Sequence, residues 1–361
     1  MKTEATGTTA TTTRILALDN LRVVLTVLVV VHHAAITYSH IPLWYYSEPA
    51  QDPSGFLLDV LLVMNQAFFM GFFFLISGFF TPGSYDRKGA GRFVVDRLLR
   101  LGIPLLAYVV LLRPLVGLGG YLTEDRQVPY WQYYLDTWDA GPMWFAEVLI
   151  VFALAYAGWR ALRAPLPARP APLRTRWIVL FTLGLAAATI LWRIPVPTGT
   201  YALGLPTPDF MPQYAAMFVL GCVAHRRGWF ETLPVRASRA GFGAAGAATV
   251  ALMPVALGTG PLASAAISVW QSVFAVGMII GLTVWFRERW NRQGPRGRFL
   301  SRHAYAVYVV HPLVLVGLGW ALRWLSAPAA VKFLIMLVPA LPLCWGLAFL
   351  VRRLPGADRV L

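Results

Sequence analysis

Apolar residues follow one another along this chain in long runs, which short polar connections separate. Ten of these runs have the length and composition of helices that cross a bilayer with a core of about 30 Å. They cover residues 17–39, 56–80, 98–120, 142–160, 177–193, 210–226, 240–258, 262–286, 303–323 and 331–351. The pattern therefore predicts an all-α polytopic membrane protein with about ten transmembrane helices.

The two ends of the chain lie outside this pattern. Residues 1–14 are rich in Thr, and we expect them to form a disordered cytoplasmic tail. The apolar run that follows is too long for a signal-peptide core and has no convincing cleavage site, so we expect it to be retained. The transmembrane domain then covers residues 15–351, and residues 352–361 form a short cytoplasmic tail.

Basic residues are distributed unevenly between the connections. Of the 31 Lys and Arg residues, 25 fall in one alternating set of loops and tails. The opposite loops hold only Arg126, Arg193, Arg323 and Lys332. By the positive-inside rule, this asymmetry places both termini in the cytoplasm of a multi-pass cytoplasmic membrane protein.

Composition excludes other classes of protein. Charged residues make up 13% of the chain, whereas soluble domains carry roughly 25%. The basic residues behind the net charge of +15 lie in alternate loops, so the charge indicates membrane topology and not a nucleic-acid partner. The two cysteines provide neither a disulfide framework nor the spacing of a zinc site, and we expect no metal and no bound cofactor.

The first predicted helix carries ionisable residues inside an apolar run. At about 100° per residue, Arg22 and His33 fall on one stripe, roughly 16 Å apart along the axis, whereas His32 points about 100° away. The stripe is completed by Asp19, Thr26, Val29 and Thr37. Because ionisable groups within the membrane are costly, they are candidates for function. In a structural alternative, Arg22 extends to the lipid headgroups beside Asp19, and His33 is a packed polar residue.

Further polar residues follow in later spans. Glu147 lies in the outer third of the fourth span, where its carboxylate needs a basic partner or a proton, and His33 is the obvious partner. Ser77 lies near the cytoplasmic end of the second span, in the segment FFMGFFFLISGFFTPG. There Gly71 and Gly78 permit close approach of another backbone.

Two more segments carry candidate site residues. Arg97 and Arg100 lie one helical turn apart at the predicted cytoplasmic face, where paired guanidiniums suit phosphates or simply set the topology. The ninth span, HAYAVYVVHPLV, places Tyr308 in its cytoplasmic half and His311 at mid-membrane before Pro312, which favours a kinked helix beside a cavity.

The predicted outer loops 40–55 and 121–141 are both aromatic and acidic. Such residues are typical of an aromatic belt at the membrane interface, and a platform that stacks on sugars is the alternative.

Four segments in this order resemble the acyltransferase-3 family of membrane O-acyltransferases. They are LDNLRVVLTVLVVVHH, in which Arg22 and His33 match the Arg-ten residues-His motif, FFFLISGFF, the run from Arg97 to Pro104, and AYAVYVVHP. The segments LDNLR and GPMWFAEVL resemble the branch that includes glucan succinyltransferases. The resemblance covers roughly residues 15–351.

This resemblance implies transfer of an acyl group from cytoplasmic acyl-CoA to a hydroxyl of a sugar or glycosylated acceptor. His33 would be the general base, oriented by Glu147. Arg22, Arg97 and Arg100 would bind the donor, and Ser77, Tyr308 and His311 would line the cavity. Direct transfer and a covalent acyl-histidine both stay open, as do the acceptor, the acyl length and a homo-oligomeric state. Two alternatives are a proton-coupled transporter of a sugar or small anion, with His33 and Glu147 as relay, and a non-catalytic membrane subunit.

Overall fold

The structure is a computed structural model, and it describes residues 15–41, 43–123, 127–163 and 167–361. Within these ranges the regular structure is helical and no named strand forms, which confirms the predicted all-α class. The tail predicted at residues 1–14 lies outside the described residues. The predicted C-terminal tail contains one short helix, α14 (Ala357–Val360).

The described chain folds into long helices joined by short irregular elements. The long helices are α1 (Leu16–Tyr38), α2 (Gly55–Arg97), α4 (Arg113–Thr123), α6 (Trp144–Ala161), α7 (Thr175–Trp192), α8 (Met211–Arg227), α10 (Arg236–Ala256), α11 (Pro261–Arg289), α12 (Pro295–Leu322) and α13 (Ala329–Val351). The short ones are η1 (Leu98–Gly102), α3 (Ile103–Ala107), η2 (Tyr108–Leu112), α5 (Tyr130–Asp136), η3 (Gly141–Met143), η4 (Pro208–Phe210) and α9 (Trp229–Thr232).

Seven helical segments of the described chain are long and apolar enough to cross a membrane. One of them, Gly55–Thr123, contains two of the predicted spans. The predicted spans 210–226 and 240–258 are helical, as α8 and α10, but they are not among the seven. The protein is therefore a multi-pass membrane protein. The count of ten and the cytoplasmic placement of the termini stay predictions.

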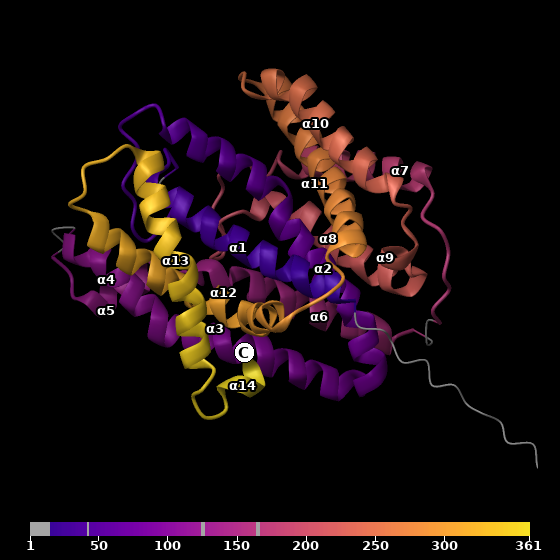
Figure 1. Cartoon of the computed structure of the whole chain (residues 1–361), viewed down its shortest axis with the longest axis horizontal. Helices are drawn as coiled ribbons and strands as arrows, with labels where there is room; N and C mark the ends of the chain where they lie inside the picture. Colours follow the sequence, from indigo (N-terminus) through magenta and orange to yellow (C-terminus); the bar gives the residue numbers. More distant parts are fainter. Residues whose placement is uncertain (1–14, 42, 124–126, 164–166) are drawn as a thin grey trace, which may run out of the picture.

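Helix α1 lies in the middle of the bundle and packs against α2, α11, α12 and α13 (Figure 1). Its buried residues occur on most sides of the helix, and they include Leu18, Leu21, Val29 and Val30. A helix that is apolar all round belongs inside a membrane bundle. The polar stripe of α1 is therefore surrounded largely by protein, which suits a site.

Helix α2 extends beyond the predicted end of its span at residue 80 and continues to Arg97. Gly89, with φ of +72°, bends the chain so that residues 90–97 run in a new direction (Figure 1). Residues with a Cβ rarely adopt this conformation, whereas glycine does so at no steric cost. After the bend, Phe93 packs against Ala153 and Ala157 of α6. The bend thus brings Arg97 next to a membrane helix.

Helices α2 and α8 approach each other closely through two glycines. A Cβ on Gly78 would overlap the carbonyl oxygen of Phe218, and a Cβ on Gly221 would overlap that of Leu75. Small residues let helix backbones approach in membranes, where packing replaces the hydrophobic effect as the driving force. The close approach expected at Gly78 is therefore present.

The third predicted span is continuous but irregular. Two π-helical turns, η1 and η2, lie on either side of α3, which contains Pro104. Proline supplies no backbone donor, and local π turns accommodate the interrupted hydrogen-bond ladder. The irregular stretch carries Arg100 in η1 and Tyr108 in η2, and Arg113 follows directly after η2.

Candidate functional site

His33 of α1 meets His311 of α12 inside the bundle. Nδ1 of His33 lies 2.9 Å from the carbonyl oxygen of Val29 and 3.2 Å from Nε2 of His311. Nδ1 of His311 in turn lies 2.7 Å from the carbonyl oxygen of Tyr308. His311 is fully buried, and His33 is half-buried. Two of the predicted site residues, far apart in the sequence, therefore form one pair.

The contacts of the pair assign the protons of both neutral rings. A carbonyl oxygen only accepts, so Nδ1–H of His311 donates to Tyr308 and Nε2 of His311 is left as an acceptor. Nδ1–H of His33 then donates to Val29 and is shared with that acceptor. Nε2 of His33 keeps an unshared electron pair, and no hydrogen bond to it occurs within the described ranges. The network thus presents His33 Nε2 as a base.

Trp44, from the loop after α1, covers this pair. Its ring centroid lies 4.2 Å from that of His33 and 6.2 Å from that of His311. The indole Nε1–H is buried and has no hydrogen-bond partner in the described part of the chain. A buried donor beside a base is available for a substrate oxygen. Trp44 is therefore a site residue that the sequence reasoning missed, since it assigned this loop to an interfacial belt.

A polar cluster holds the same loop in place. The Tyr45 hydroxyl donates to Asp139 at 2.6 Å, and it also accepts from Tyr108 at 3.2 Å. Arg113, only 3% exposed, donates through Nε to Asp139 at 3.0 Å and through Nη2 to the carbonyl oxygen of Thr137 at 2.7 Å. A buried guanidinium needs such a paired and hydrogen-bonded partner. The sequence reasoning gave Arg113 no role, although an arginine inside an apolar run is the signal that could have found it.

Helix α13 holds the far end of the loop. Asp52 Oδ2 accepts from the backbone N–H of Ala329 at 2.8 Å, and Ser54 Oγ accepts from that of Ala330 at 3.0 Å. These two hydrogen bonds satisfy backbone donors in the first turn of α13. The pKa of Asp52 lies below its usual value, mainly because the Ser54 side chain hydrogen-bonds to its carboxylate and then because Ala329 does. Glu48 also pairs with the buried Lys332. The loop is therefore fixed at both ends above the histidine pair.

His32 has different neighbours, as the helical stripe predicts. Its ring stacks on Phe69 with centroids 5.1 Å apart, and its Nδ1 lies 3.4 Å from the side-chain nitrogen of Asn65. Asn65 also donates to the carbonyl oxygen of Leu28 at 3.1 Å. Adjacent histidines thus have separate surroundings, and only His33 contacts His311.

Glu147 is half-buried near the start of α6. No hydrogen bond or ion pair joins it to His33 within the described residues, so the structure does not bring together the two residues expected to act as a pair. His311 occupies the place next to His33 Nδ1 instead. The Tyr308 hydroxyl donates to the carbonyl oxygen of Pro142, and this contact links α12 to the turn before α6.

Arg22 lies at the other end of the stripe. Its Nη1 is 3.7 Å from Asp19, and the guanidinium side chain is 41% exposed. Thr26 donates to the carbonyl oxygen of Arg22 at 2.8 Å, and Thr37 donates to that of His33 at 3.0 Å. The hydroxyls of the stripe therefore bond to their own helix. Arg22 and His33 stay as the groups that can face a ligand.

Arg97 and Arg100 have different surroundings, although they lie one turn apart. The Arg97 guanidinium lies over the ring of Phe93, 5.2 Å from its centroid, and its buried Nε has no hydrogen-bond partner among the described residues. Arg100 is exposed and pairs through Nε with Asp96 at 3.2 Å, while Lys88 pairs with Asp96 at 2.8 Å. Of the two predicted arginines, Arg97 is half-buried, and its Nε is the buried donor without a partner among the described residues.

A second arginine, Arg226, lies in the last turn of α8. Arg226 Nη1 pairs with Asp86 at 2.6 Å, whereas its buried Nη2 has no hydrogen-bond partner in the described ranges. Arg160 pairs with the same carboxylate at 3.3 Å. One carboxylate, that of Asp86, thus pairs with two guanidiniums. Sequence reasoning counted Arg226 only as a topology signal.

Two further expectations from the sequence concern Ser77 and metal binding. Ser77 is half-buried in α2, and no contact of its hydroxyl with the histidine pair occurs within the described residues. Its carbonyl oxygen accepts from Thr81 at 2.8 Å. Within the described ranges, no group of three or more His, Cys, Asp or Glu side chains is arranged to hold a metal ion.

Comparison with known proteins gives the family of this chain. No curated protein matches the chain, and no solved structure matches it. A family model described as an acyltransferase domain matches residues 15–349, which is nearly the whole chain and includes the histidine pair, Trp44 and both arginine clusters. This chain belongs to the acyltransferase-3 family and is a membrane acyltransferase.

Proposed function

We propose that this protein is an O-acyltransferase of the cytoplasmic membrane that moves an acyl group from cytoplasmic acyl-CoA to a hydroxyl of a sugar or glycosylated acceptor. The observation that carries the proposal is the free Nε2 of His33, whose ring is fixed through Nδ1 by Val29 and His311. A ring held in one tautomer and orientation is the arrangement that general-base catalysis needs.

In this mechanism, Nε2 of His33 takes the proton of the acceptor hydroxyl as its oxygen attacks the thioester carbonyl. His311 Nε2 and the Val29 carbonyl then both accept from the imidazolium through Nδ1–H, which stabilises the charge without moving a second proton. The tetrahedral intermediate collapses, the C–S bond breaks, and His33 returns its proton to the departing thiolate. A C–O bond has formed, and the thiol of CoA is released.

Trp44 supports the same step. Its buried indole N–H has no partner among the described residues and lies against His33. A donor without a partner in a water-poor site can bond to the oxygen on which negative charge develops. The Tyr45, Asp139 and Arg113 cluster then acts as a positioning device, since it holds the loop that carries Trp44.

The donor binds at the side predicted to be cytoplasmic. Arg97 Nε and Arg226 Nη2 are buried donors without partners in the described ranges, and phosphate oxygens of CoA would satisfy both. Arg22 and Arg100 add positive charge nearer the solvent. The pantetheine arm would then extend along the α1 stripe toward His33, past Ser77 and Tyr308. The acyl group and acceptor within these classes, including the succinyl transfer of the resembled branch, are part of this proposal.

Purified protein in detergent should cleave the thioester of radiolabelled acetyl-CoA or succinyl-CoA with no ion gradient present. It should do so faster when a glycan acceptor is added. The physical reason is that base and carbonyl meet within one site, so no transmembrane driving force enters the reaction. Thin-layer separation of labelled products measures the result. A protein that moves sugar across proteoliposomes but leaves the thioester intact would instead be a transporter.

Substituting Lys for Arg97 should raise the KM for acyl-CoA about tenfold with little change in kcat. Lysine keeps the charge but loses the planar donor set, and a hydrogen bond to a charged group contributes about 1.5–3 kcal/mol. Arg226→Lys should act in the same direction. Steady-state kinetics at varied donor concentration measure both variants. The matched control is Arg236→Lys, an exposed arginine at the start of α10 on the same predicted face. Equal KM values in all three would remove Arg97 and Arg226 from the donor site.

A further inference from the structure

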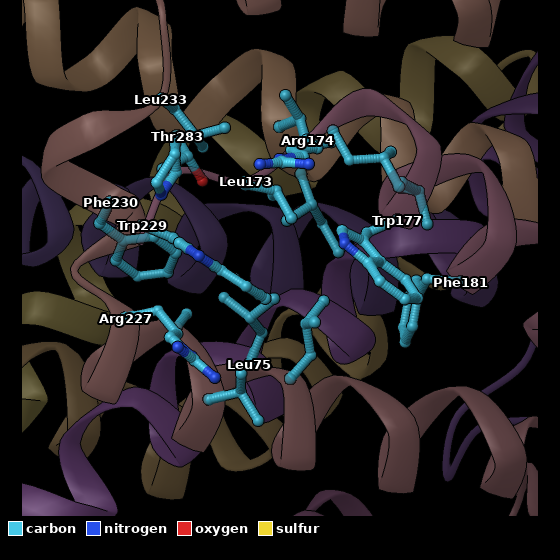
Figure 2. A pocket seen from close by; sticks show the side chains of 18 of the residues that line it. Leu75, Leu173, Arg174, Trp177, Phe181, Arg227, Trp229, Phe230, Leu233 and Thr283 are labelled. Carbon is cyan, nitrogen blue, oxygen red and sulfur yellow. The ribbon is translucent and has the colours of Figure 1, made fainter. Parts of the chain in front are cut away.

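A large cavity lies apart from the histidine pair. It has a volume of about 660 Å³ and opens between α2, α7, α8, α9 and α11 (Figure 2). Neither His33, His311 nor Trp44 lines it. Pockets of 300–1,000 Å³ are large enough for organic ligands. The cavity is therefore large enough for a ligand other than the substrates of the histidine site.

Most of the cavity wall is apolar. Its deep residues come from three helices and include Leu75 of α2, Met217 and Leu220 of α8, and Ile279 and Ile280 of α11. An apolar void of this size would forfeit the contacts of all the side chains around it, and water would not fill it favourably. Hydrocarbon is the occupant that suits such a wall.

Helix α7 has its fully buried residues in one half only. Its buried residues, Leu185, Ala186 and Thr189, all lie in its second half. The first half lines the cavity instead, with Trp177 and Phe181 among the lining residues. The first half of α7 is therefore only partly buried beside the cavity, and an occupant would complete the packing of this helix.

One end of the cavity is basic. Arg174, Arg176 and Arg227 line it, and no acidic residue is among the described lining residues. None of the three forms an ion pair within the described ranges. Figure 2 shows Arg174 and Arg227, with Trp177 and Trp229, as side chains that line the cavity. By the charge distribution, this end faces the cytoplasm, where anionic lipids attract basic clusters.

The basic end is held by hydrogen bonds. The backbone N–H of Arg169 donates to the carbonyl oxygen of Arg226 at 3.0 Å, and that of Ala171 donates to Arg227 at 3.2 Å. The indole N–H of Trp229 donates back to Ala171 at 2.9 Å. Gly228, with φ of +64°, makes the turn that brings Trp229 to the cavity. The arginines therefore project from a fixed frame.

We propose that this cavity binds one anionic phospholipid of the cytoplasmic leaflet, with acyl chain carbons against the apolar wall and the phosphate between Arg174 and Arg227. Charge complementarity at one end and a hydrocarbon wall elsewhere match an amphiphile with a single charged headgroup. Acyl-CoA does not fit, because its adenine, ribose and pantetheine amides would be buried against side chains that offer them few partners. The lipid is a structural ligand that holds α7 to the bundle.

The test is native mass spectrometry of protein purified in detergent, with added dioleoylphosphatidylglycerol or dioleoylphosphatidylcholine. The wild-type protein should retain one phosphatidylglycerol molecule in preference to phosphatidylcholine. Each arginine near an anionic surface contributes roughly fivefold in affinity, so R174Q/R227Q should bind phosphatidylglycerol about 25-fold more weakly. The control R236Q/R239Q removes two exposed arginines at the start of α10, which do not line the cavity, and should bind like wild type.

A second variant fills the cavity without changing charge. Ile280→Trp should displace the lipid and leave a folded protein that still elutes as a single species. Equal retention of both lipids by the wild type, or equal loss in R174Q/R227Q and the control, would overturn the proposal in favour of ordinary annular lipid. Displacement of bound phosphatidylglycerol by acetyl-CoA, but not by inorganic phosphate, would overturn it in favour of a donor site.

Discussion

Replacing His33 by Ala should lower acyl transfer by about a hundred- to ten-thousand-fold while the protein still inserts and accumulates. Loss of an acid–base group typically costs that much in rate. His33 is the group of the pair whose Nε2 is unprotonated and open, because His311 uses both of its nitrogens within the protein. His33→Gln should be equally inactive, since an amide fills the space but does not accept a proton at neutral pH. Labelled product formed per amount of protein in membranes is the measurement.

His32→Ala is the matched control on the adjacent position. Its ring packs on Phe69 and Asn65, so its removal costs packing and leaves the Nε2 of His33 in place. We expect transfer within about tenfold of wild type, and a lower thermal midpoint. Comparable loss of transfer in both variants at matched expression would mean that the first helix is simply intolerant of change. Near wild-type transfer in His33→Ala would remove His33 from the reaction.

Sequence periodicity was sufficient to predict that the two adjacent histidines face different surroundings. An angle of about 100° per residue separates their side chains on any straight helix, whatever packs around it. It did not predict the partner of His33, because that choice depends on how α12 crosses α1. Pro312 indicated that α12 was unusual near His311, but only the crossing brings His311 Nε2 to 3.2 Å from His33. Glu147, expected there, makes no described contact with the ring.

For the arginines at the predicted cytoplasmic face, too, the sequence did not predict the tertiary surroundings. The pair one turn apart was visible in the sequence, yet the bend at Gly89 and the packing of Phe93 on α6 decide which arginine is the less exposed. Arg226 comes from a helix about 130 residues later, and no local pattern distinguishes it from the other basic residues of that loop set. The sequence predicts which side chains share one face of a helix. It does not predict which side chains of two different helices meet, because that depends on tertiary contacts.

Replacing Gly221 by Ala should lower the thermal midpoint of the purified protein by about 5 °C. A Cβ at this position would overlap the carbonyl oxygen of Leu75 and lie 2.7 Å from the backbone nitrogen of Phe79. Both are main-chain atoms of α2, so no side chain can move aside, and the helices must separate. Overpacking of this kind costs typically 1–3 kcal/mol, which corresponds to a few degrees in a protein of this size.

The matched control is Gly184→Ala in α7, where a Cβ would meet nothing within 4 Å. Both substitutions replace a helical glycine by alanine, which favours the helix by up to about 1 kcal/mol. That gain is common to the two variants, so the difference between their midpoints measures the α2–α8 contact alone. Gly184→Ala should be unchanged or slightly more stable. If Gly221→Ala were as stable as this control, α2 and α8 would not approach each other at Gly221 as closely as the structure has them.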